Sequence, residues 1–559
     1  MKETYVGGDI IETTGGNNLS YAKGNIENSG EQVIQNGKTN GVAYGTNRKW
    51  EGPVEIVSIK WLDENGKPLA KKTINTIEYD AFLYGEKVKV EVTFSKNITQ
   101  DVELKIRSSF SKKFEENFKI KPQGTKVTTP LFIIPLDVYD DSKEKYQYNE
   151  DSAGKSHYTY YEKELEYFTV SVVSEVGAKF FDDEKDILKP YTYFRNYEEL
   201  VGIFKNSKTT YEDEYIKSNP DIEKLVNEFI DFITNKENIS TEQNINERVN
   251  TDAPKLWKYA VEQVQGGELD DRPLYWARNK MQTYLKRHPV FKDHIDYETS
   301  IVKKATGLES IIKKFEELSR NYTGIDFSKA NGKKKVLITG FDPFQLNPSY
   351  TFAGPETFNP SGILALSLNN NTTDFDTQTC IFPVRYEDFD NECVEKVIRR
   401  YIGDVDVIIT TSLNGGNAWF DIEQNAIEYR GGGSDNMFIG SDEEIIDKVK
   451  VMNNIERFIS NKNKVYNYTT LPQEKIFGNK LNDSIKINNL IVKFDINKSN
   501  TEGAGGNYLS NEIMYRATKV RGNISLKPVG HFHLANLETI KRVSDVLKVT
   551  KEVIKKIIL

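Results

Sequence analysis

Three stretches near the C-terminal end of the sequence carry side chains that could together form a catalytic set. Ser510 lies in residues 504–515, Glu423 closes residues 414–423, and His533 closes the run Gly530-His531-Phe532-His533. A hydroxyl, an imidazole and a carboxylate are the parts of a nucleophile, a general base and a group that orients the base. Whether this set works with a serine oxygen decides whether the chain is an enzyme.

The composition excludes several classes of protein. A chain of 559 residues is too long for one core and predicts three or four domains. The net charge of -8 gives no basic face for nucleic acid. Two cysteines, Cys380 and Cys393, make neither a disulfide framework nor a zinc motif, and His531 and His533 have no third ligand at a suitable spacing. We expect no metal and no cofactor.

The N-terminal residues carry no export signal of the Sec type. Residues 1–5 have neither a basic region nor an apolar region after it, and the longest apolar run, residues 130–136, is far too short to span a membrane. We therefore expect a protein that is made in the cytoplasm without a membrane span. Export would need a route other than a Sec signal.

Residues 1–50 form a glycine-rich N-terminal segment. Nine glycines fall in the first 45 residues, and short apolar pieces alternate with pairs such as Gly15-Gly16 and Asn36-Gly37. This pattern predicts either short strands with tight turns or a poorly ordered tail. Because the segment has too little apolar surface to fold alone, we predict that it docks on a partner.

Residues 51–180 show the period of two that is typical of half-buried strands. Val88, Val90 and Val92 alternate with charged or polar residues, and Val102 and Leu104 do the same after a short polar connection. The pattern predicts an antiparallel β-sandwich of immunoglobulin-like size.

Residues 181–330 change to the period of a helix. Asn219 precedes an amphipathic stretch with Ile222, Leu225 and Phe229 on one face, which predicts a capped helix within a helical domain. The segment Asp270–Arg278 allows two interpretations. It is either a helix start, with acidic residues at the positive end and aromatic residues packed inward, or a binding site.

Residues 333–559 alternate strands with helices. Apolar runs at 336–339, 378–382 and 405–410 predict strands, while residues 392–401 and 443–451 predict helices. This alternation favours an α/β/α three-layer domain with a mainly parallel sheet. Functional residues of such a domain are expected at the carboxyl ends of its strands.

The first 325 residues resemble the shared N-terminal part of polymorphic toxins and type VI secretion effectors of Bacteroidota. The glycine-rich opening, residues 59–63, residues 84–86 and the run Arg272–Arg278 carry the resemblance. It implies that this part is a delivery platform that binds a secretion spike or tube component. It also implies that the C-terminal domain carries a toxic activity, for which an immunity protein would exist.

The C-terminal region resembles pyroglutamyl peptidase I, a family of cysteine peptidases that remove N-terminal pyroglutamate. Eight short motifs occur in the family's order between about residues 333 and 540: 340–344, 359–361, 382–384, 414–416, 422–427, 470–472, 510–515 and 530–533. The resemblance implies the pyroglutamyl peptidase fold and a substrate with a peptide or amide bond.

The same resemblance implies the roles of individual residues. Glu423 matches the catalytic glutamate, His533 the base, and Ser510 the position of the cysteine. The substrate-binding residues that it implies are Phe341, Phe344, Asn417 and Tyr508, of which the two phenylalanines would sandwich a lactam ring. Asn417 stands where the family usually has arginine.

A serine at position 510 leaves three alternatives open. A thiolate is favoured at a helix start, whereas a hydroxyl must lose its proton to an aligned base during attack. Ser510 is therefore an engineered replacement that silences the enzyme, a natural loss that leaves a binding or structural module, or the nucleophile of a working serine enzyme. The substrate is a pyroglutamyl peptide, a peptidoglycan-type peptide or another amide.

Overall fold

The computed structural model describes most of the chain beyond residue 53. The described residues are 54–134, 148–150, 156–158, 168–174, 209–235, 241–295, 301–346, 354–437, 466–478, 484–496, 502–536 and 542–558, without 75, 83–84, 109–113, 417 and 432–434. The predicted docking segment, residues 1–50, lies outside them, as do residues 181–208 of the predicted helical domain and the predicted helix at 443–451. Within these limits no helix is long and apolar enough to cross a membrane.

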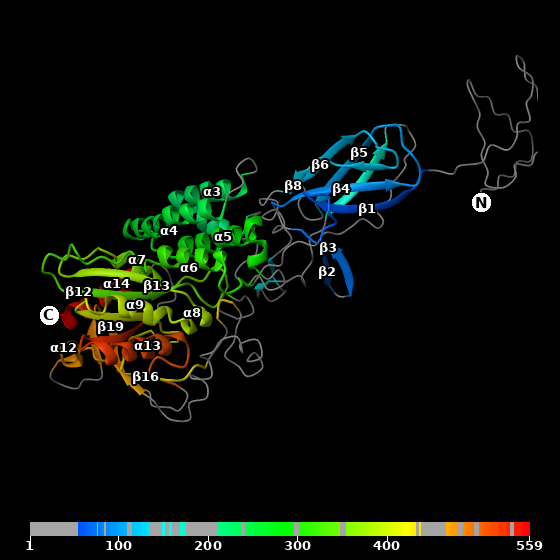
Figure 1. The fold of residues 1–559 in the computed structure, drawn as a ribbon. Coiled ribbons are helices and arrows are strands. Elements are labelled where there is room, and N and C mark those ends of the chain that lie inside the picture. The colour runs from blue at the N-terminus through cyan, green and yellow to red at the C-terminus, as the bar shows by residue number, and fades with distance from the viewer. Residues whose placement is uncertain are drawn as a thin grey trace, which may run out of the picture.

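Two small antiparallel sheets form the N-terminal region (Figure 1). One contains β1 (Ile56–Asp63), β4 (Lys87–Phe94) and β7 (Lys126–Thr128), with β8 (Phe132–Ile133) beside β4; the other contains β11 (Phe168–Ser174), β5 (Val102–Ser108) and β6 (Glu115–Ile120). The pairs β2 (Lys71–Ile74) with β3 (Ile77–Asp80) and β9 (Tyr148–Glu150) with β10 (Ser156–Tyr158) are separate. Every second residue is buried throughout β4 and from Val102 to Ile106 of β5, which confirms the predicted strands. An immunoglobulin-like sandwich stays a prediction.

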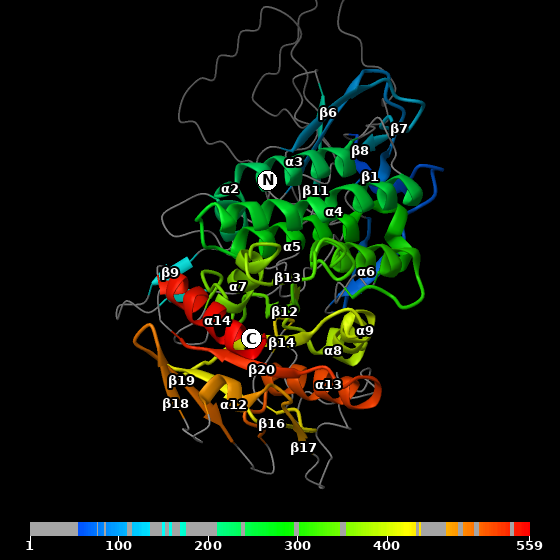
Figure 2. The same ribbon diagram turned by 90° about the vertical axis from the view of Figure 1, so that its left-hand side faces the viewer.

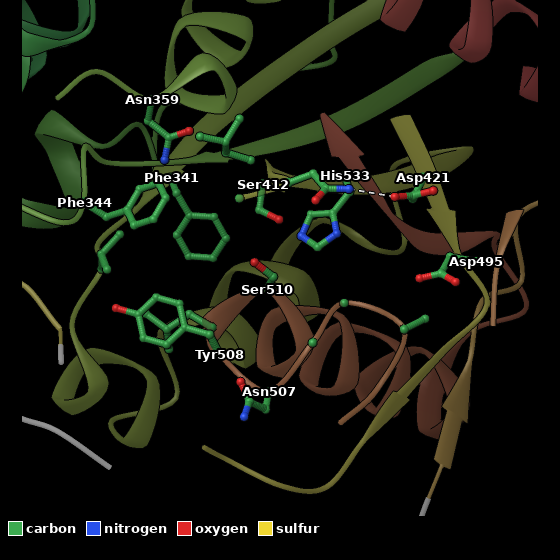
Figure 3. A pocket seen from close by; sticks show the side chains of 18 residues that line it. Phe341, Phe344, Asn359, Ser412, Asp421, Asp495, Asn507, Tyr508, Ser510 and His533 are labelled. Atoms are coloured by element: carbon green, nitrogen blue, oxygen red, sulfur yellow. Dashed lines mark hydrogen bonds between the residues drawn. The ribbon is translucent and has the colours of Figure 1, made fainter. Parts of the chain in front are cut away.

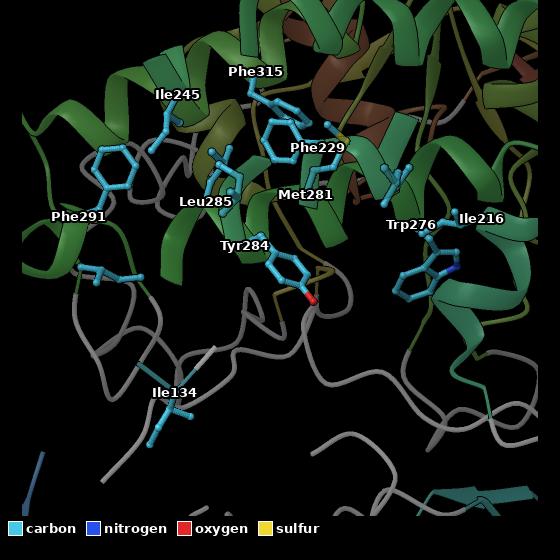
Figure 4. Packing of buried hydrophobic residues seen from close by; sticks show 14 of the residues in the cluster. Ile134, Ile216, Phe229, Ile245, Trp276, Met281, Tyr284, Leu285, Phe291 and Phe315 are labelled. Carbon is cyan, nitrogen blue, oxygen red and sulfur yellow. The ribbon is translucent and has the colours of Figure 1, made fainter. Parts of the chain in front are cut away.

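The described residues between 209 and 319 form five α-helices, and Figure 1 shows most of them between the strands and the C-terminal region. They are α2 (Tyr211–Lys217), α3 (Pro220–Thr234), α4 (Glu242–Gln265), α5 (Arg272–Arg287) and α6 (Gly307–Ser319), with a 3-10 helix η3 (Pro289–His294) after α5. The Asn219 side chain accepts hydrogen bonds from two backbone N–H groups and starts α3, as predicted. Phe229, Met281 and Phe315, from three different helices, meet in the core (Figure 4).

The C-terminal region is built on a seven-stranded sheet in the order β13-β12-β14-β20-β15-β19-β18. Its strands are β12 (Lys335–Phe341), β13 (Asp376–Phe382), β14 (Val407–Leu413), β15 (Phe420–Glu423), β18 (Ser484–Ile487), β19 (Leu490–Asp495) and β20 (Val529–Leu534). Four neighbouring pairs are parallel, and β15–β20 and β18–β19 are antiparallel. The predicted α/β domain with a mainly parallel sheet is therefore present.

Helices cover both faces of this sheet (Figure 2). They are α7 (Pro360–Leu368), α8 (Tyr386–Asp390), α9 (Cys393–Tyr401), α12 (Gln473–Phe477), α13 (Leu509–Ile524) and α14 (Val543–Ile558), and a short pair of strands, β16 (Asn425–Ile427) and β17 (Tyr466–Tyr468), lies beside α13. Successive residues of β12 alternate between the faces. Val336 and Ile338 pack in the core that includes α14, while Leu337 packs in the core that includes α9 and α13.

A buried ion cluster joins the helices to the α/β domain. The carboxylate of Asp342, directly after β12, contacts the guanidinium groups of Arg278 in α5 and of Arg320 after α6; the Arg320 contact is 2.7 Å long. All three side chains are almost fully buried. Asp271 adds a second link, because both of its carboxylate oxygens accept the backbone N–H of Asn359.

The segment Asp270–Arg278 thus forms a helix start with aromatic residues packed inward, the first of the two interpretations, with one difference. Helix α5 begins at Arg272, and Leu274, Tyr275 and Trp276 point into the core. Asp271, however, makes no capping hydrogen bond to its own helix and instead holds the loop before α7. The sequence could not show this use, because it depends on a residue 88 positions away.

Replacing Asp342 with asparagine should strongly destabilise the fold, because two buried guanidinium groups lose their shared carboxylate. We expect the free energy of unfolding to fall by about 3–5 kcal/mol, the usual cost of removing one partner from a buried pair. The matched variant Arg278→Leu removes one of the two cations and leaves Asp342 paired with Arg320, so its loss should be smaller. Urea unfolding followed by tryptophan fluorescence compares the two. Equal losses would contradict the sharing of Asp342.

Candidate functional site

A pocket of about 350 Å³ opens at the carboxyl ends of β12, β14 and β20 and at the start of α13. Its labelled side chains in Figure 3 are Phe341, Phe344, Asn359, Ser412, Asp421, Asp495, Asn507, Tyr508, Ser510 and His533. The rule that sites lie at the carboxyl ends of parallel strands therefore locates the pocket.

Ser510 lies in the first turn of α13 and lines the pocket. The loop before it turns tightly: Gly503 and Gly506 exchange two backbone hydrogen bonds of 2.9 and 3.0 Å, and Gly506 has a φ of +82°, which favours glycine. The amide of Asn511 fixes the helix start from the other side. It accepts from the N–H of Ile427 and donates to the carbonyls of Ile427 and Tyr429.

His533 and Glu423 lie on the adjacent antiparallel strands β20 and β15. Nδ1 of His533 is 2.6 Å from Oε1 of Glu423, whose side chain is fully buried. Burial raises the pKa of Glu423, and the neighbouring imidazole opposes this rise. Because Glu423 occupies Nδ1, Nε2 is the nitrogen of His533 that remains for a group in the pocket.

Aromatic rings form one end of the pocket. Phe341, the last residue of β12, is 3% exposed and stacks on Phe389 at 6.1 Å between ring centroids. Phe344 is half-buried, and Tyr508 packs edge-on against Tyr386. The structure thus places the two phenylalanines and Tyr508 beside Ser510, as Figure 3 shows. Asn417, the fourth expected binding residue, lies outside the described residues.

Carboxylates form the opposite end, and the sequence analysis did not single them out. Asp421 and Asp495 lie beyond His533 in Figure 3. Burial, together with the charges of Glu423 and Asp495, raises the pKa of Asp421 to about 7. The Asn414 side-chain amide donates to Asp421 at 2.7 Å. Asp495 ends β19, so the strand-end rule could have found it if β19 had been recognised.

Neither cysteine belongs to this site. Cys380 is buried in β13 and Cys393 begins α9, and neither lines the pocket. Burial raises the pKa of both thiols, which makes them poor nucleophiles. Among the described residues, no group of three or more His, Cys, Asp or Glu side chains is arranged to hold a metal ion.

Comparisons with known proteins match separate parts of the chain. A family described as the PA0049 N-terminal domain matches residues 211–303, from α2 to just beyond η3. The uncharacterized protein PA0049 of Pseudomonas aeruginosa is 28% identical over 190 residues, which cover 30% of this chain and 33% of that protein. The match thus spans about a third of the length of this relative.

Solved structures of pyroglutamyl peptidases are similar over 40% of the chain. A mutant pyrrolidone carboxyl peptidase from Pyrococcus furiosus is 23% identical, with 100% of that chain covered and a TM-score of 0.29. The pyroglutamyl peptidase I of Bacillus amyloliquefaciens is 18% identical, with 93% covered and a TM-score of 0.29. Scores this low carry no functional conclusion. The effector resemblance of the first 325 residues stays a prediction.

The raised pKa of Asp421 should make stability depend on pH. Between the ordinary aspartate pKa near 4 and the folded value of about 7, the folded state binds more protons than the unfolded state. Stability should therefore fall as pH rises through this window, by at most about 1.4 kcal/mol per pH unit. Asp421→Asn removes this titration, so its stability relative to wild type should rise from pH 4 to pH 7.

Urea unfolding at several pH values measures this effect. The exposed Asp404 supplies the matched control, since Asp404→Asn removes one carboxylate that is not buried. Parallel pH profiles of wild type and Asp421→Asn would show that Asp421 has no raised pKa.

Proposed function

We propose that residues 333–559 form a pyroglutamyl-peptidase-like amide hydrolase site with Ser510 as the nucleophile, His533 as the base and Glu423 as the group that orients it. One observation carries the proposal: the buried Glu423 contacts Nδ1 of His533 at 2.6 Å, and His533 opens into the same pocket as Ser510. The likeness to pyroglutamyl peptidases agrees with it but adds no evidence for the chemistry.

The geometry supports a two-step reaction. Ser510 Oγ attacks the carbonyl carbon of the amide while its proton passes to Nε2 of His533, and Glu423 stabilises the imidazolium that forms. The negative charge that develops on the carbonyl oxygen is favoured near the N-terminus of α13, where the helix dipole is positive. His533 then gives the proton to the leaving amine. Water, activated by the same histidine, releases the acyl group from Ser510.

The pocket favours a small acyl group. Phe341, Phe344 and Tyr508 offer flat apolar surfaces at one end of a 350 Å³ space, which suits a five-membered lactam or a similarly compact group. Pyroglutamyl peptides are the first candidates, and peptidoglycan-type peptides the second. A non-catalytic binding module is the competing function, since the same pocket would hold the ligand without cleaving it.

Serine makes this site slow. A thiol at the start of α13 would be partly ionised through the helix dipole and the nearby imidazole, whereas a hydroxyl depends wholly on alignment with His533. The shorter serine side chain also leaves the oxygen displaced from the position that sulfur would occupy. A nucleophile displaced by about 1 Å loses roughly 10²-fold in rate.

Ser510→Cys should therefore raise kcat/KM by roughly 10²-fold, because a sulfur in the correct position recovers the rate that the displaced serine oxygen loses. Hydrolysis of a pyroglutamyl anilide and of muropeptides is compared for wild type, Ser510→Cys and Ser510→Ala. Ser525→Cys, at the other end of α13, is the matched control for any thiol on this helix. Inactivity of all forms on every substrate would favour the binding module. A wild-type rate near that of Ser510→Cys would identify a true serine enzyme.

We also propose that residues 1–325 deliver this domain, a role that rests on the sequence resemblance alone. Residues 1–50 would dock on a secretion spike or tube component, and an immunity protein would protect the producing cell. Deleting residues 1–50 should abolish export without altering hydrolysis by the purified protein, because the catalytic residues lie elsewhere. The exported fraction is measured by immunoblot. Unchanged export, or none from the intact chain, would contradict the delivery role.

A further inference from the structure

A second histidine beside the proposed catalytic pair belongs to a buried polar chain. His531 is two residues before His533 on β20, fully buried, and its ring lies edge-on to that of His533 at 4.9 Å between centroids. Nδ1 of His531 is 2.8 Å from the Thr410 hydroxyl, and Nε2 is 2.8 Å from the Ser412 hydroxyl. Both partners lie on β14, the strand parallel to β20. Of these three residues, Ser412 lines the pocket.

The hydrogen bonds that link Thr410, His531 and Ser412 run in one direction. The Thr410 hydroxyl donates to the carbonyl of Gly530, so its oxygen accepts the Nδ1–H of His531. In a neutral ring with hydrogen on Nδ1, Nε2 carries a lone pair and accepts the Ser412 hydroxyl hydrogen. Burial and the neighbouring His533 lower the pKa of His531 well below its usual value, which keeps the ring neutral. The Ser412 hydrogen is therefore committed to His531.

A serine whose hydrogen is committed presents only lone pairs to its other neighbours. Ser412 is 4% exposed, and that remaining surface belongs to the pocket between Phe341 and His533 (Figure 3). A ligand atom at this point must therefore supply a hydrogen. An acceptor or a methylene group would leave the lone pairs of the buried Ser412 oxygen without a donor.

We propose that Ser412 is a specificity-determining residue that accepts a hydrogen bond from an N–H group of the substrate's acyl part, with His531 and Thr410 as the residues that fix its orientation. The proposal rests on the proposed function, since it concerns the acyl end of the same pocket. It selects compact acyl groups that carry an N–H, such as a lactam, over carbocycles of equal size.

The arrangement favours recognition over a second nucleophilic centre. His533 has a carboxylate on its far nitrogen, whereas His531 has only the neutral hydroxyl of Thr410. A hydroxyl gives little stabilisation to an imidazolium, and a fully buried ring disfavours that charge further. His531 is thus suited to fix the direction of the Ser412 hydroxyl hydrogen and unsuited to take up that proton.

Equilibrium binding separates this proposal from catalysis, because it needs no turnover. The probes are 5-oxopyrrolidine-2-carboxamide and its carbocyclic analogue, 3-oxocyclopentane-1-carboxamide, in which a methylene replaces the ring N–H. Calorimetry on the full chain with Ser510→Ala, which cannot hydrolyse the carboxamide of either probe, should show roughly tenfold tighter binding of the lactam, the scale of one hydrogen bond in a buried site. Ser412→Ala should reduce this ratio to near one.

Two further variants make the result specific. Thr411→Val removes a buried hydroxyl from the same strand, but that hydroxyl donates to the Thr339 carbonyl, so the ratio should stay unchanged. Thr410→Val leaves the pocket lining intact and removes the acceptor of Nδ1–H; it should lower the ratio partly, which a purely structural role would not do. It also tests the proposal if Ser412→Ala fails to fold.

Several outcomes would overturn the proposal. They are equal affinity of the Ser510→Ala chain for the two probes, a ratio that survives Ser412→Ala in that chain, and no binding of either probe. Labelling of Ser412 by a fluorophosphonate would also overturn it, by showing that this serine is a nucleophile. Failure of hydrolysis in every form, with the binding ratio intact, would reject the proposed catalysis and leave the role of Ser412 standing.

Discussion

The pocket depends on one buried carboxylate. In the sequence, Asp342 lies between Phe341 and Phe344, two of the rings at the aromatic end of the pocket. Its carboxylate contacts the guanidinium groups of Arg278 and Arg320 from the helical region. Burying these charges is costly, and the cost is offset only when all partners are in place. The paired ions therefore fix the start of the loop after β12, between Phe341 at the strand end and Phe344 in the loop, and both rings line the pocket that contains Ser510. The helical region thus helps to position residues of the pocket.

A second buried ion cluster fixes the start of α13, the helix that carries Ser510. Glu512, two residues after Ser510, contacts Arg430 at 2.6 Å and Arg516 at 2.8 Å, and Asp390 pairs with Arg430 from the other side. Burial opposes the charge of Glu512, but the two guanidinium groups hold its pKa below the usual value. Helix α13 is therefore anchored in its first turn. Both clusters lie outside the pocket lining and fix the elements that carry Phe344 and Ser510.

The sequence predicts local features of this fold well and contacts between distant strands poorly. Alternation in β4 and the cap at Asn219 follow from neighbouring residues, and ordered motifs single out Glu423, Ser510 and His533. Asp421 could not be assigned to the pocket in this way. Its placement follows from β15 lying antiparallel beside β20, and no periodicity reveals the order of strands in a sheet. For the same reason the sequence did not predict the hydrogen bond between Ser412 and His531, which are 119 residues apart.

The two histidines of β20 differ in role although they lie on one strand: His533 is the proposed base, and His531 stays neutral. Residues two apart on a strand face the same way, so His531 and His533 lie side by side and cannot both carry a positive charge at low cost. Glu423 contacts His533, and hydroxyl groups contact His531 on both nitrogens. The carboxylate directs the proton to His533, while the neutral His531 adds no repulsion to the imidazolium that must form. A second carboxylate beside His531 would remove this difference, and the base would then compete with its neighbour for the proton from Ser510.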